Sequence, residues 1–387
     1  MAYSKQQLNE LLNDMVHCIN IDDELFDAAN KDYEELGEWI NKTTEKEGTR
    51  YSVSIYPQGS FALGTVVRPT SQEDDYDLDL VCLINNGNHL SAEELKLFVV
   101  RSWLENYKKR STDLIEKRRC WHVDYDDVPH FHMDVIPAIP RYSLAESDDI
   151  KITNKDDSAI PVYTYQGSNP KGYQEWFFTQ CRKKKPVNSS FGSSQDMPFQ
   201  EDLKPNKNKT KLQKEIQLLK RHRDIMFEND MENKPVSIII TTLAAQIYSG
   251  EETLLDCIVG FIERVENYLY LTSINGQYSI PNPSFGGEDF ADKWHEHPER
   301  KEAFFRWVHQ LKKDFNLELV CNMDRVSLGN HLKKLFGAKA AGLVYYIRGK
   351  KEAALVQAEE LKVSNESGNL SRAGTITVPP NRHYGEV

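Results

Sequence analysis

Two carboxylates separated by a single residue, Asp77 and Asp79, lie in a segment that continues as an apolar run. A β-strand presents every second side chain on the same face, so both carboxylates point to one side while Leu78 and Leu80 point to the other. Like charges this close repel unless a cation neutralises them, and all-oxygen ligands suit Mg²⁺ or Mn²⁺. The pattern predicts a metal platform, although an acidic turn leading into an edge strand would give the same residues.

A third carboxylate, Asp134, stands alone inside the apolar run 131–136, which is closed by Pro137. An unpaired buried charge costs on the order of several kcal/mol, so the surroundings of Asp134 must supply a cation or hydrogen-bond donors. A metal ion would meet this need.

A glycine and a serine, Gly59 and Ser60, follow an alternating segment and precede the apolar residues 61–63. Glycine would let the backbone approach a phosphate closely, while amides and the Ser60 hydroxyl donate to it. The pair therefore predicts an anion cradle beside the metal platform, and an ordinary turn is the alternative.

The second half of the chain adds a lysine and a serine. Lys220 lies in the row Leu212, Ile216, Lys220, Arg223 and Phe227, which has helical spacing, so it faces inward with the apolar residues. Ser237 follows Pro235 at a predicted helix start, where backbone amides are unpaired. The alternatives are a lysine whose ammonium reaches solvent and an ordinary serine at a helix N-terminus.

Gly-Ser, then Asp-x-Asp, then an isolated Asp on a later strand resembles the nucleotidyltransferase fold of polymerase-β-like enzymes. More closely, the sequence is similar to the bacterial cGAS/DncV-like nucleotidyltransferases (CD-NTases) of CBASS anti-phage systems. The segments that carry this resemblance are Gln58–Phe61, Tyr76–Val81, Phe131–Ala138, Leu219–Asp224, Lys234–Leu243, Ile280–Pro283 and Phe290–Trp294. One departure is the gap of 17 positions between Ser60 and Asp77, so Asp75 competes with Asp77 as the first ligand.

The resemblance implies an α+β fold, in which a mixed-sheet catalytic lobe and a helical lobe enclose an active-site cleft. It assigns metal binding and catalysis to Asp77, Asp79 and Asp134, with two Mg²⁺ ions that Mn²⁺ can replace. Nucleotide binding falls to the set Gln58, Gly59, Ser60, Lys220 and Ser237.

The implied activity joins ATP, GTP, UTP or CTP into a cyclic di- or trinucleotide, or a related oligonucleotide, that a downstream effector reads. In some relatives the C-terminus is conjugated to cellular targets, so the tail here has a possible conjugation or regulatory partner. The alternatives are a template-independent RNA or tRNA nucleotidyltransferase and a catalytically inactive nucleotide-binding module. The acidic charge argues against the former, and the three intact carboxylates argue against the latter.

Composition narrows the choice of partners. The 387 residues carry a net charge of −11, which opposes tight binding to duplex nucleic acid or an anionic membrane. The sequence lacks the run of about 18 apolar residues needed to span a membrane and begins without a signal-peptide pattern, so we expect a cytoplasmic protein.

The six scattered cysteines are expected to be reduced. His130-Phe131-His132 and His295-Glu296-His297 lack the spacing of a structural zinc site, and none is expected.

The residues that carry chemistry must be positioned by two lobes. Strands are predicted at 51–56, 80–84 and 131–136, with a helix over 91–119 that begins with Ser91 and Glu94. Further helices are predicted at 207–230, 235–249, 251–272, 298–315 and 324–361. The predicted organisation is N-terminal helices that brace both lobes (1–48), a catalytic lobe (49–181), a basic flexible loop (182–206), a helical lobe (207–363) and a disordered tail (364–387).

Overall fold

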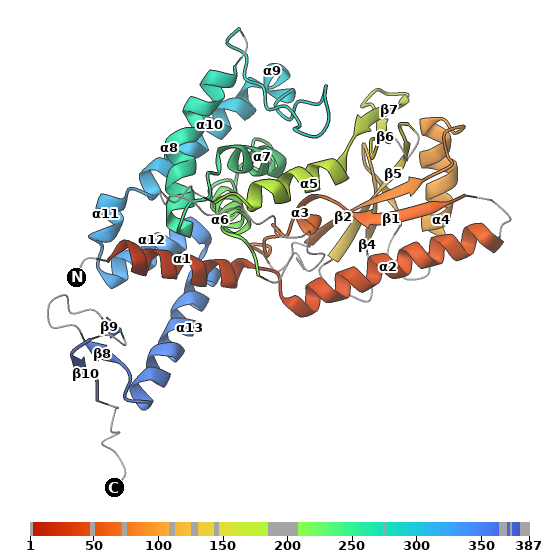
Figure 1. Ribbon diagram of the computed structural model, residues 1–387. Coiled ribbons are helices and arrows are strands. Elements are labelled where there is room, and N and C mark those ends of the chain that lie inside the picture. The colour runs from red at the N-terminus through yellow and green to blue at the C-terminus, as the bar shows by residue number, and fades with distance from the viewer. Residues whose placement is uncertain are drawn as a thin grey trace, which may run out of the picture.

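The computed structural model describes residues 3–46, 51–71, 76–107, 113–124, 131–142, 147–184, 208–273, 275–363, 370–371 and 374–379. Figure 1 shows a sheet-containing lobe beside a helical lobe, with α2 (Asp23–Lys46) running along the sheet. The competing first ligand Asp75 and residues 185–206 of the predicted basic loop lie outside the described residues.

A mixed sheet of seven strands forms the catalytic lobe, in the order β1-β2-β5-β4-β3, with β6 joining β5 and β7 pairing with β6. Strands β2 and β5 are parallel, whereas the pairs β1–β2, β4–β5 and β5–β6 are antiparallel. The strands are β1 (Val53–Pro57), β2 (Tyr76–Ile84), β3 (Ile115–Glu116), β4 (Trp121–Asp124), β5 (Phe131–Pro140), β6 (Ile150–Lys155) and β7 (Tyr163–Ser168).

The alternation along β2 sorts its side chains between two environments. Leu78, Leu80 and Cys82 enter a core with residues of α2, of the π-helical segment η1 (Glu94–Val100) and of α4 (Arg101–Glu105). Asp77 and Asp79 face the opposite side, where Val81 and Leu83 join a smaller apolar cluster further along the strand. One face of the sheet is therefore packed by helices, and the other face carries the carboxylates.

The helix predicted over 91–119 is shorter in the structure. Ser91 and Glu94 form the expected reciprocal pair, since the amide of each residue donates to the side chain of the other. The helical turns end at Glu105, and 115–116 form β3 instead. Pairing of β3 with β4 overrides the local helical spacing in this segment.

The helical lobe has its own core, to which α1 and α5 also contribute. The predicted helix 324–361 is broken at Gly337, whose φ of +90° suits glycine and separates α12 from α13. The helices are α1 (Lys5–Ile19), α5 (Pro170–Cys181), α6 (Lys211–Met226), α7 (Ser237–Ile247), α8 (Leu254–Thr272), α9 (Lys293–Glu296), α10 (Pro298–Asp314), α11 (Leu317–Cys321), α12 (Arg325–Phe336) and α13 (Ala338–Gln357).

Two predicted boundaries differ from the structure. The predicted catalytic lobe, 49–181, includes α5. In the structure, however, the buried Tyr173, Phe177 and Cys181 of this helix pack in the core of the helical lobe. The tail was predicted to be disordered from 364, yet 370–371 and 376–377 form strands β9 (Leu370–Ser371) and β10 (Ile376–Thr377) on either side of β8 (Lys362–Val363). Backbone pairing orders these short strands without a large apolar core.

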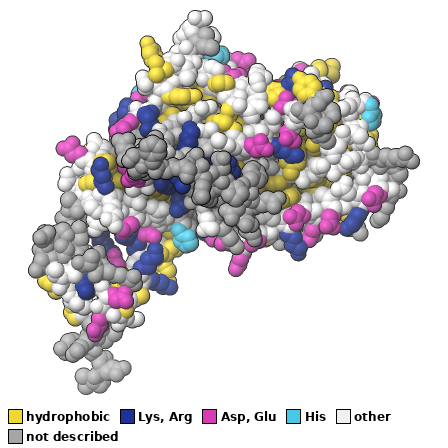
Figure 2. Space-filling view, in the orientation of Figure 1, with side chains coloured by type: hydrophobic (Ala, Val, Ile, Leu, Met, Phe, Trp, Pro, Cys, Tyr) yellow, Lys and Arg dark blue, Asp and Glu magenta, His cyan; other side chains and the backbone are white. Residues whose placement is uncertain are grey.

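The exposed side chains of α2 and the state of the cysteines match the expectations from composition. Figure 2 shows acidic side chains gathered along α2, on which Asp23, Glu24, Asp27, Glu34 and Glu38 are exposed. All six cysteines are free, and five of them are buried. Among the described residues, no helix is both long and apolar enough to cross a membrane.

Candidate active site

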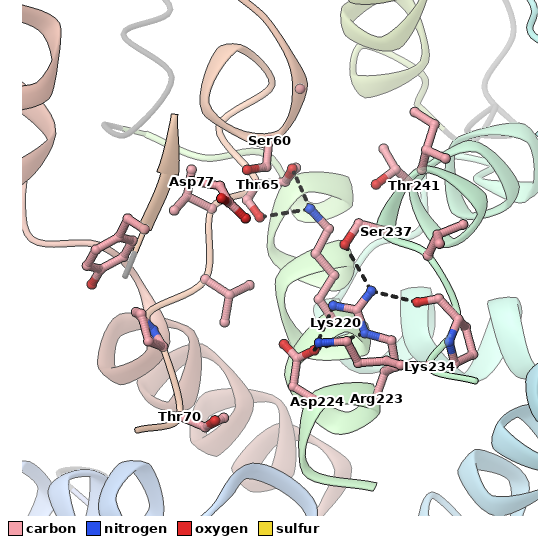
Figure 3. Close-up of a pocket in the computed structure, with 18 of the residues that line it drawn as sticks. Ser60, Thr65, Thr70, Asp77, Lys220, Arg223, Asp224, Lys234, Ser237 and Thr241 are labelled. Carbon is pink, nitrogen blue, oxygen red and sulfur yellow. Dashed lines mark hydrogen bonds and ion pairs between the residues drawn. The ribbon is translucent and has the colours of Figure 1, made fainter. Parts of the chain in front are cut away.

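A cavity of about 1020 Å³ separates the two lobes and brings together most of the predicted site residues. Its catalytic-lobe wall includes Gly59, Ser60, Asp77 and Asp79, and its helical wall includes Lys220, Arg223, Asp224, Lys234 and Ser237. Figure 3 shows Ser60 and Asp77 on one side, the Lys220 ammonium in the middle, and Ser237 with Arg223 beyond it. Gln58 and Asp134 are not among the described residues that line this cavity.

Strand register gathers the three carboxylates. Asp79 lies directly opposite Asp134 on the neighbouring parallel strand, and Asp77 lies opposite His132. Residues paired in this way share one face of a sheet, so all four side chains project toward the cavity side. Three carboxylates on adjacent strands are the kind of oxygen donor that a divalent cation takes.

The two carboxylates of Asp-x-Asp have different electrostatic surroundings. Burial raises the pKa of Asp79 to about 7, and the charges of Asp77 and Asp134 add to this effect. By contrast, the hydrogen bond with His132 lowers the pKa of Asp77. Asp79 is thus the carboxylate that most needs a cation to ionise at neutral pH, which agrees with a metal-binding role.

Asp134 receives its counter-charges from side chains that the sequence reasoning did not single out. His122 Nδ1 lies 2.8 Å from Asp134 Oδ1, and Lys117 Nζ donates to both carboxylate oxygens at 3.1 Å. The Lys117 ammonium is both a cation and a hydrogen-bond donor, so it meets the need expected for Asp134. His132 of the His-x-His pair also belongs to this region, whereas His130 lies outside the described residues.

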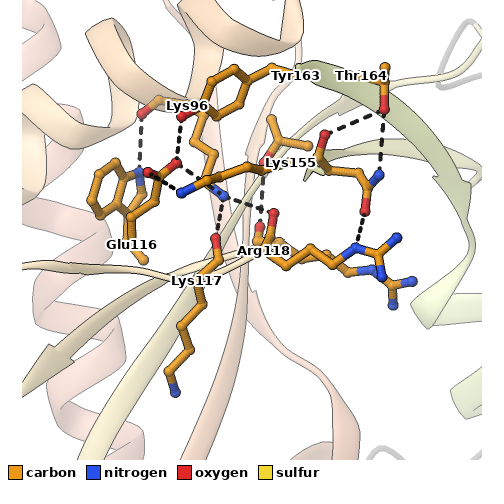
Figure 4. Close-up of polar contacts among 11 residues, drawn as sticks. Lys96, Glu116, Lys117, Arg118, Lys155, Tyr163 and Thr164 are labelled. Atoms are coloured by element: carbon orange, nitrogen blue, oxygen red, sulfur yellow. Dashed lines mark hydrogen bonds and ion pairs between the residues drawn. The ribbon is translucent and has the colours of Figure 1, made fainter. Parts of the chain in front are cut away.

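A buried ion cluster fixes the backbone from which Lys117 projects (Figure 4). The Lys96 ammonium is fully buried and donates to the carbonyls of Lys117 and Arg118 at 2.5 and 2.9 Å. Glu116 lies 3.6 Å from Lys96 Nζ and accepts a hydrogen bond from Lys155 at 3.0 Å. Anchored in this way, the Lys117 side chain runs away from the cluster and reaches Asp134.

Gly59 allows the closest approach between the glycine turn and the metal platform. Its φ is +59°, and a Cβ built on it would lie only 2.6 Å from Asp79 Oδ2. The neighbouring Gln58 donates its backbone amide to the carbonyl of Asp79 at 2.8 Å. This backbone bond ties the turn to β2. Nucleotide binding by Gln58, which is not among the described residues that line the cavity, stays a prediction.

Lys220 is buried and faces the catalytic lobe, as the helical spacing predicts. Its Nζ donates to the carbonyl and to Oγ1 of Thr65, each at 3.2 Å, and burial lowers the pKa of Lys220 to about 7. At the start of α7, the Ser237 hydroxyl accepts a hydrogen bond from Arg223 at 2.9 Å. Both predicted side chains line the cavity, and both already have polar partners.

Glutamines of α6 join the two lobes at the segment that follows Ser60. Gln213 Nε2 donates to the carbonyl of Leu63 at 2.9 Å, and Gln217 Nε2 donates to the carbonyl of Val66 at 2.5 Å. These donors recur at helical spacing with Lys220, so one face of α6 binds the backbone of 63–66. The glycine turn and the helical wall of the cavity are held together by these bonds.

Comparison with known proteins agrees with this geometry. Residues 53–138, which carry Gly59, Ser60, Asp77, Asp79 and Asp134, match the family described as "Cyclic GMP-AMP synthase DncV-like, nucleotidyltransferase domain". A c-di-GMP synthase of Roseivirga ehrenbergii is 29% identical over 313 residues, which cover 81% of this chain and 80% of that protein. These matches make the chain similar to the DncV-like nucleotidyltransferases.

Solved structures show the same fold. The CD-NTase CdnG of Bradyrhizobium diazoefficiens, determined in complex with GTP, superposes with a TM-score of 0.69 at 21% identity and covers 88% of this chain and 98% of its own. CdnC of Escherichia coli MS115-1, in a complex with HORMA-deltaN, gives a TM-score of 0.56 at 12% identity, with coverage of 83% and 94%. The predicted fold class, a mixed-sheet lobe with a helical lobe, is confirmed.

The sequence alone does not indicate several side chains that lie beside the predicted site residues. His122 and Asp124 lie on β4. The segment Trp121-His122-Val123-Asp124 alternates between apolar and polar residues and so favours a strand, but four residues make a short pattern. Lys117 and the α6 glutamines act across large sequence separations, so no local pattern indicates their partners.

Proposed function

We propose that this nucleotidyltransferase joins nucleoside triphosphates into a cyclic di- or trinucleotide, or a related oligonucleotide, that serves as a second messenger. The observation that carries the proposal is the convergence of Asp77, Asp79, Gly59, Ser60 and Lys220 on one cavity between the lobes. A volume of about 1020 Å³ lies at the upper end of ordinary small-molecule sites, which leaves room for a donor and an acceptor nucleotide. The cyclic dinucleotide synthases among its relatives support this choice of product.

The carboxylates are proposed to hold divalent ions, two Mg²⁺ that Mn²⁺ can replace. When bound, such ions neutralise phosphate oxygens and lower the pKa of an acceptor ribose hydroxyl. Asp77 and Asp79 would hold the ions from β2. Asp134 would hold the ion beside the acceptor hydroxyl and would orient or deprotonate that hydroxyl. Much of the catalysis is then alignment of the two nucleotides.

The triphosphate is proposed to lie between the glycine turn and α6. Amides at the start of α3 (Gly59–Ala62) and the Ser60 hydroxyl donate to phosphate oxygens. The Lys220 ammonium, already directed at the segment beside Ser60, adds a positive charge, and Ser237 adds a hydroxyl from α7. A bound triphosphate would also favour the charged form of Lys220, whose pKa burial lowers.

The wider role is proposed from the family resemblance. The enzyme acts in the cytoplasm in anti-phage signalling, and a downstream effector reads its product. A regulatory or conjugation partner at the C-terminal tail belongs to the same proposal, and the complex of a CdnC with HORMA-deltaN shows that a relative has a protein partner. Residues 380–387 lie outside the described part of the chain.

Pyrophosphate release tests the proposed reaction and its site together. The purified protein should release pyrophosphate from NTPs only when a divalent ion is present. The double variant Asp77→Ala and Asp79→Ala should lose this activity without losing its fold, because removing the carboxylates relieves repulsion and leaves no core cavity. Full turnover by a folded double variant would reject the site.

A further inference from the structure

One arginine of α6 connects the wall of the cavity to the start of α7. Arg223 lines the cavity between the lobes, and only 5% of its surface is exposed. Its Nη1 donates to the carbonyl of Pro235 at 2.8 Å and to the Ser237 hydroxyl at 2.9 Å. Figure 3 shows this guanidinium between Asp224 and Ser237. A side chain of α6 therefore holds the residues at which α7 begins.

Asp224 holds the other side of the same guanidinium. Arg223 Nε and Nη2 both donate to Asp224 Oδ1, at 3.0 and 2.7 Å. Lys234 Nζ lies 3.5 Å from this carboxylate oxygen as well. Because a guanidinium is planar and rigid, the bonds to Asp224 also fix the direction in which Nη1 points. The contact with Ser237 is thus set by a side chain that is anchored at its far edge.

The bond from Arg223 determines the role that the Ser237 hydroxyl can have. A guanidinium has donors and no acceptor, whereas a hydroxyl can donate one hydrogen bond and accept two. Ser237 Oγ therefore accepts from Arg223 and keeps its own proton for another partner. Within the described part of the chain, this hydroxyl donates to no other group. Since Ser237 lines the cavity, an oxygen of a bound ligand can take the proton.

The backbone amides at the start of α7 are also available to a ligand. The N-cap residue is Val236, whose apolar side chain makes no capping hydrogen bond with them. Val236, Ser237 and Ile238 all line the cavity. Amides at a helix N-terminus together with a hydroxyl that must donate are suited to the oxygens of a phosphate. The charge of Arg223 lies directly behind these donors and polarises the hydroxyl.

We infer that Arg223 is a positioning residue for nucleotide binding, which makes the Ser237 hydroxyl a donor and directs it at the triphosphate. The inference rests on the proposed function, because it explains how one proposed contact of the same site is formed. Arg223 acts through Ser237, since its own guanidinium already has protein partners on both sides. Lys220, one turn earlier in α6, has the separate role of direct contact with the triphosphate.

Binding of nucleotides that cannot react tests the inference without turnover. The α,β-methylene analogues of ATP and GTP, each with Mg²⁺, are titrated into the full-length protein, and their affinity is measured by calorimetry. We expect Arg223→Met to weaken binding by about tenfold, the size expected when a charge-assisted hydrogen bond is lost. Analogue binding that is equally tight in the wild type and in Arg223→Met would overturn the inference.

A double-mutant cycle separates positioning of the hydroxyl from a general structural role. In the Ser237→Ala background, Arg223→Met should weaken binding by less than about threefold, because the hydroxyl on which Arg223 acts is gone. In the Ser237→Thr background, which keeps a hydroxyl, the loss should again be about tenfold. A structural role alone would give the same loss in all backgrounds, and that result would overturn the inference.

Two further variants control for folding. Arg223→Lys keeps a charge beside Asp224, but its single ammonium cannot replace the two-sided guanidinium, so binding should weaken in the same background-dependent way. Arg264→Met is the matched control for loss of an arginine pair, since Arg264 of α8 pairs with the buried Glu251 and is not among the described residues that line the cavity. This control should change analogue binding by less than about twofold.

The inference and the proposed function can fail separately, because analogue binding requires no product. Product formation by the wild type is followed in parallel with ATP, GTP, UTP and CTP. The expected cycle in a protein that makes no cyclic product would support the role of Arg223 and reject the function. A cyclic product from a protein in which Arg223→Met binds the analogues normally would reject the role of Arg223 alone.

Discussion

Gly59→Ala should lower the catalytic rate much more than it lowers the stability of the protein. The added Cβ would lie 2.6 Å from Asp79 Oδ2, whereas ordinary contacts begin at 3.4 Å, so the carboxylate or the turn must move by about 0.8 Å. A displacement of about 1 Å at a reacting centre can cost about 100-fold in rate, and we expect kcat to fall by about this factor. The φ of +59° adds a penalty of about 1 kcal/mol to the free energy of folding, which the protein should tolerate.

A second glycine provides the control for backbone strain. Gly276 has a φ of +75°, and nothing lies within 4 Å of the position of an added Cβ. Gly276→Ala should therefore lose a similar amount of stability in chemical denaturation and keep wild-type pyrophosphate release. Wild-type kcat in Gly59→Ala, or an equal loss of kcat in both variants, would refute the argument that Gly59 is required by the closeness of Asp79.

Four further predictions concern charged groups of the site. Asp79→Asn should raise the free energy of unfolding of the metal-free protein by up to about 4 kcal/mol above pH 7. The reason is that the unfolded wild type loses the Asp79 proton near pH 4 and the folded wild type only near pH 7, so wild-type stability falls between these values. Denaturation in a chelating buffer should show that the advantage of the variant vanishes below pH 4. Lys220→Ala should raise the KM for NTP by about tenfold with a smaller effect on kcat. The wild-type KM for NTP should rise between pH 6 and pH 8, because Lys220 loses its proton in this range. Lys220→Arg should remove this rise, since arginine keeps its charge. A wild-type KM that does not change with pH would contradict this role of Lys220. Lys117→Met should strengthen divalent-ion binding by up to about fivefold in calorimetry, since the ammonium no longer competes for Asp134; weaker binding would contradict this.

Local patterns were enough to predict the parts of the site that lie on regular elements. Alternation located Asp77 and Asp79 on one face of a strand, and the apolar run 131–136 indicated the strand that carries Asp134. The helical row through Leu212 and Ile216 correctly predicted that Lys220 is buried. These predictions succeed because a side chain's direction follows from the period of its own element.

The features that were missed depend on contacts between distant segments. The shortened helix after Ser91 and the strand β3 are set by pairing with β4 and by the Lys96 ammonium, which binds carbonyls 21 and 22 residues away. His122 comes next to Asp134 only through the antiparallel register of β4 and β5. The strands β8–β10 have two residues each, which is too short for any periodicity to be recognised.

The most direct test of the central claim is the identity of the product. The purified full-length protein is incubated with ATP, GTP, UTP and CTP and a divalent ion, without primer or template, and the products are treated with phosphatase and analysed by mass spectrometry. We predict a short product with the mass of a cyclic di- or trinucleotide that resists phosphatase, since intramolecular closure has a high effective concentration. A ladder of lengthening, phosphatase-sensitive chains that forms only with an RNA primer would contradict the account.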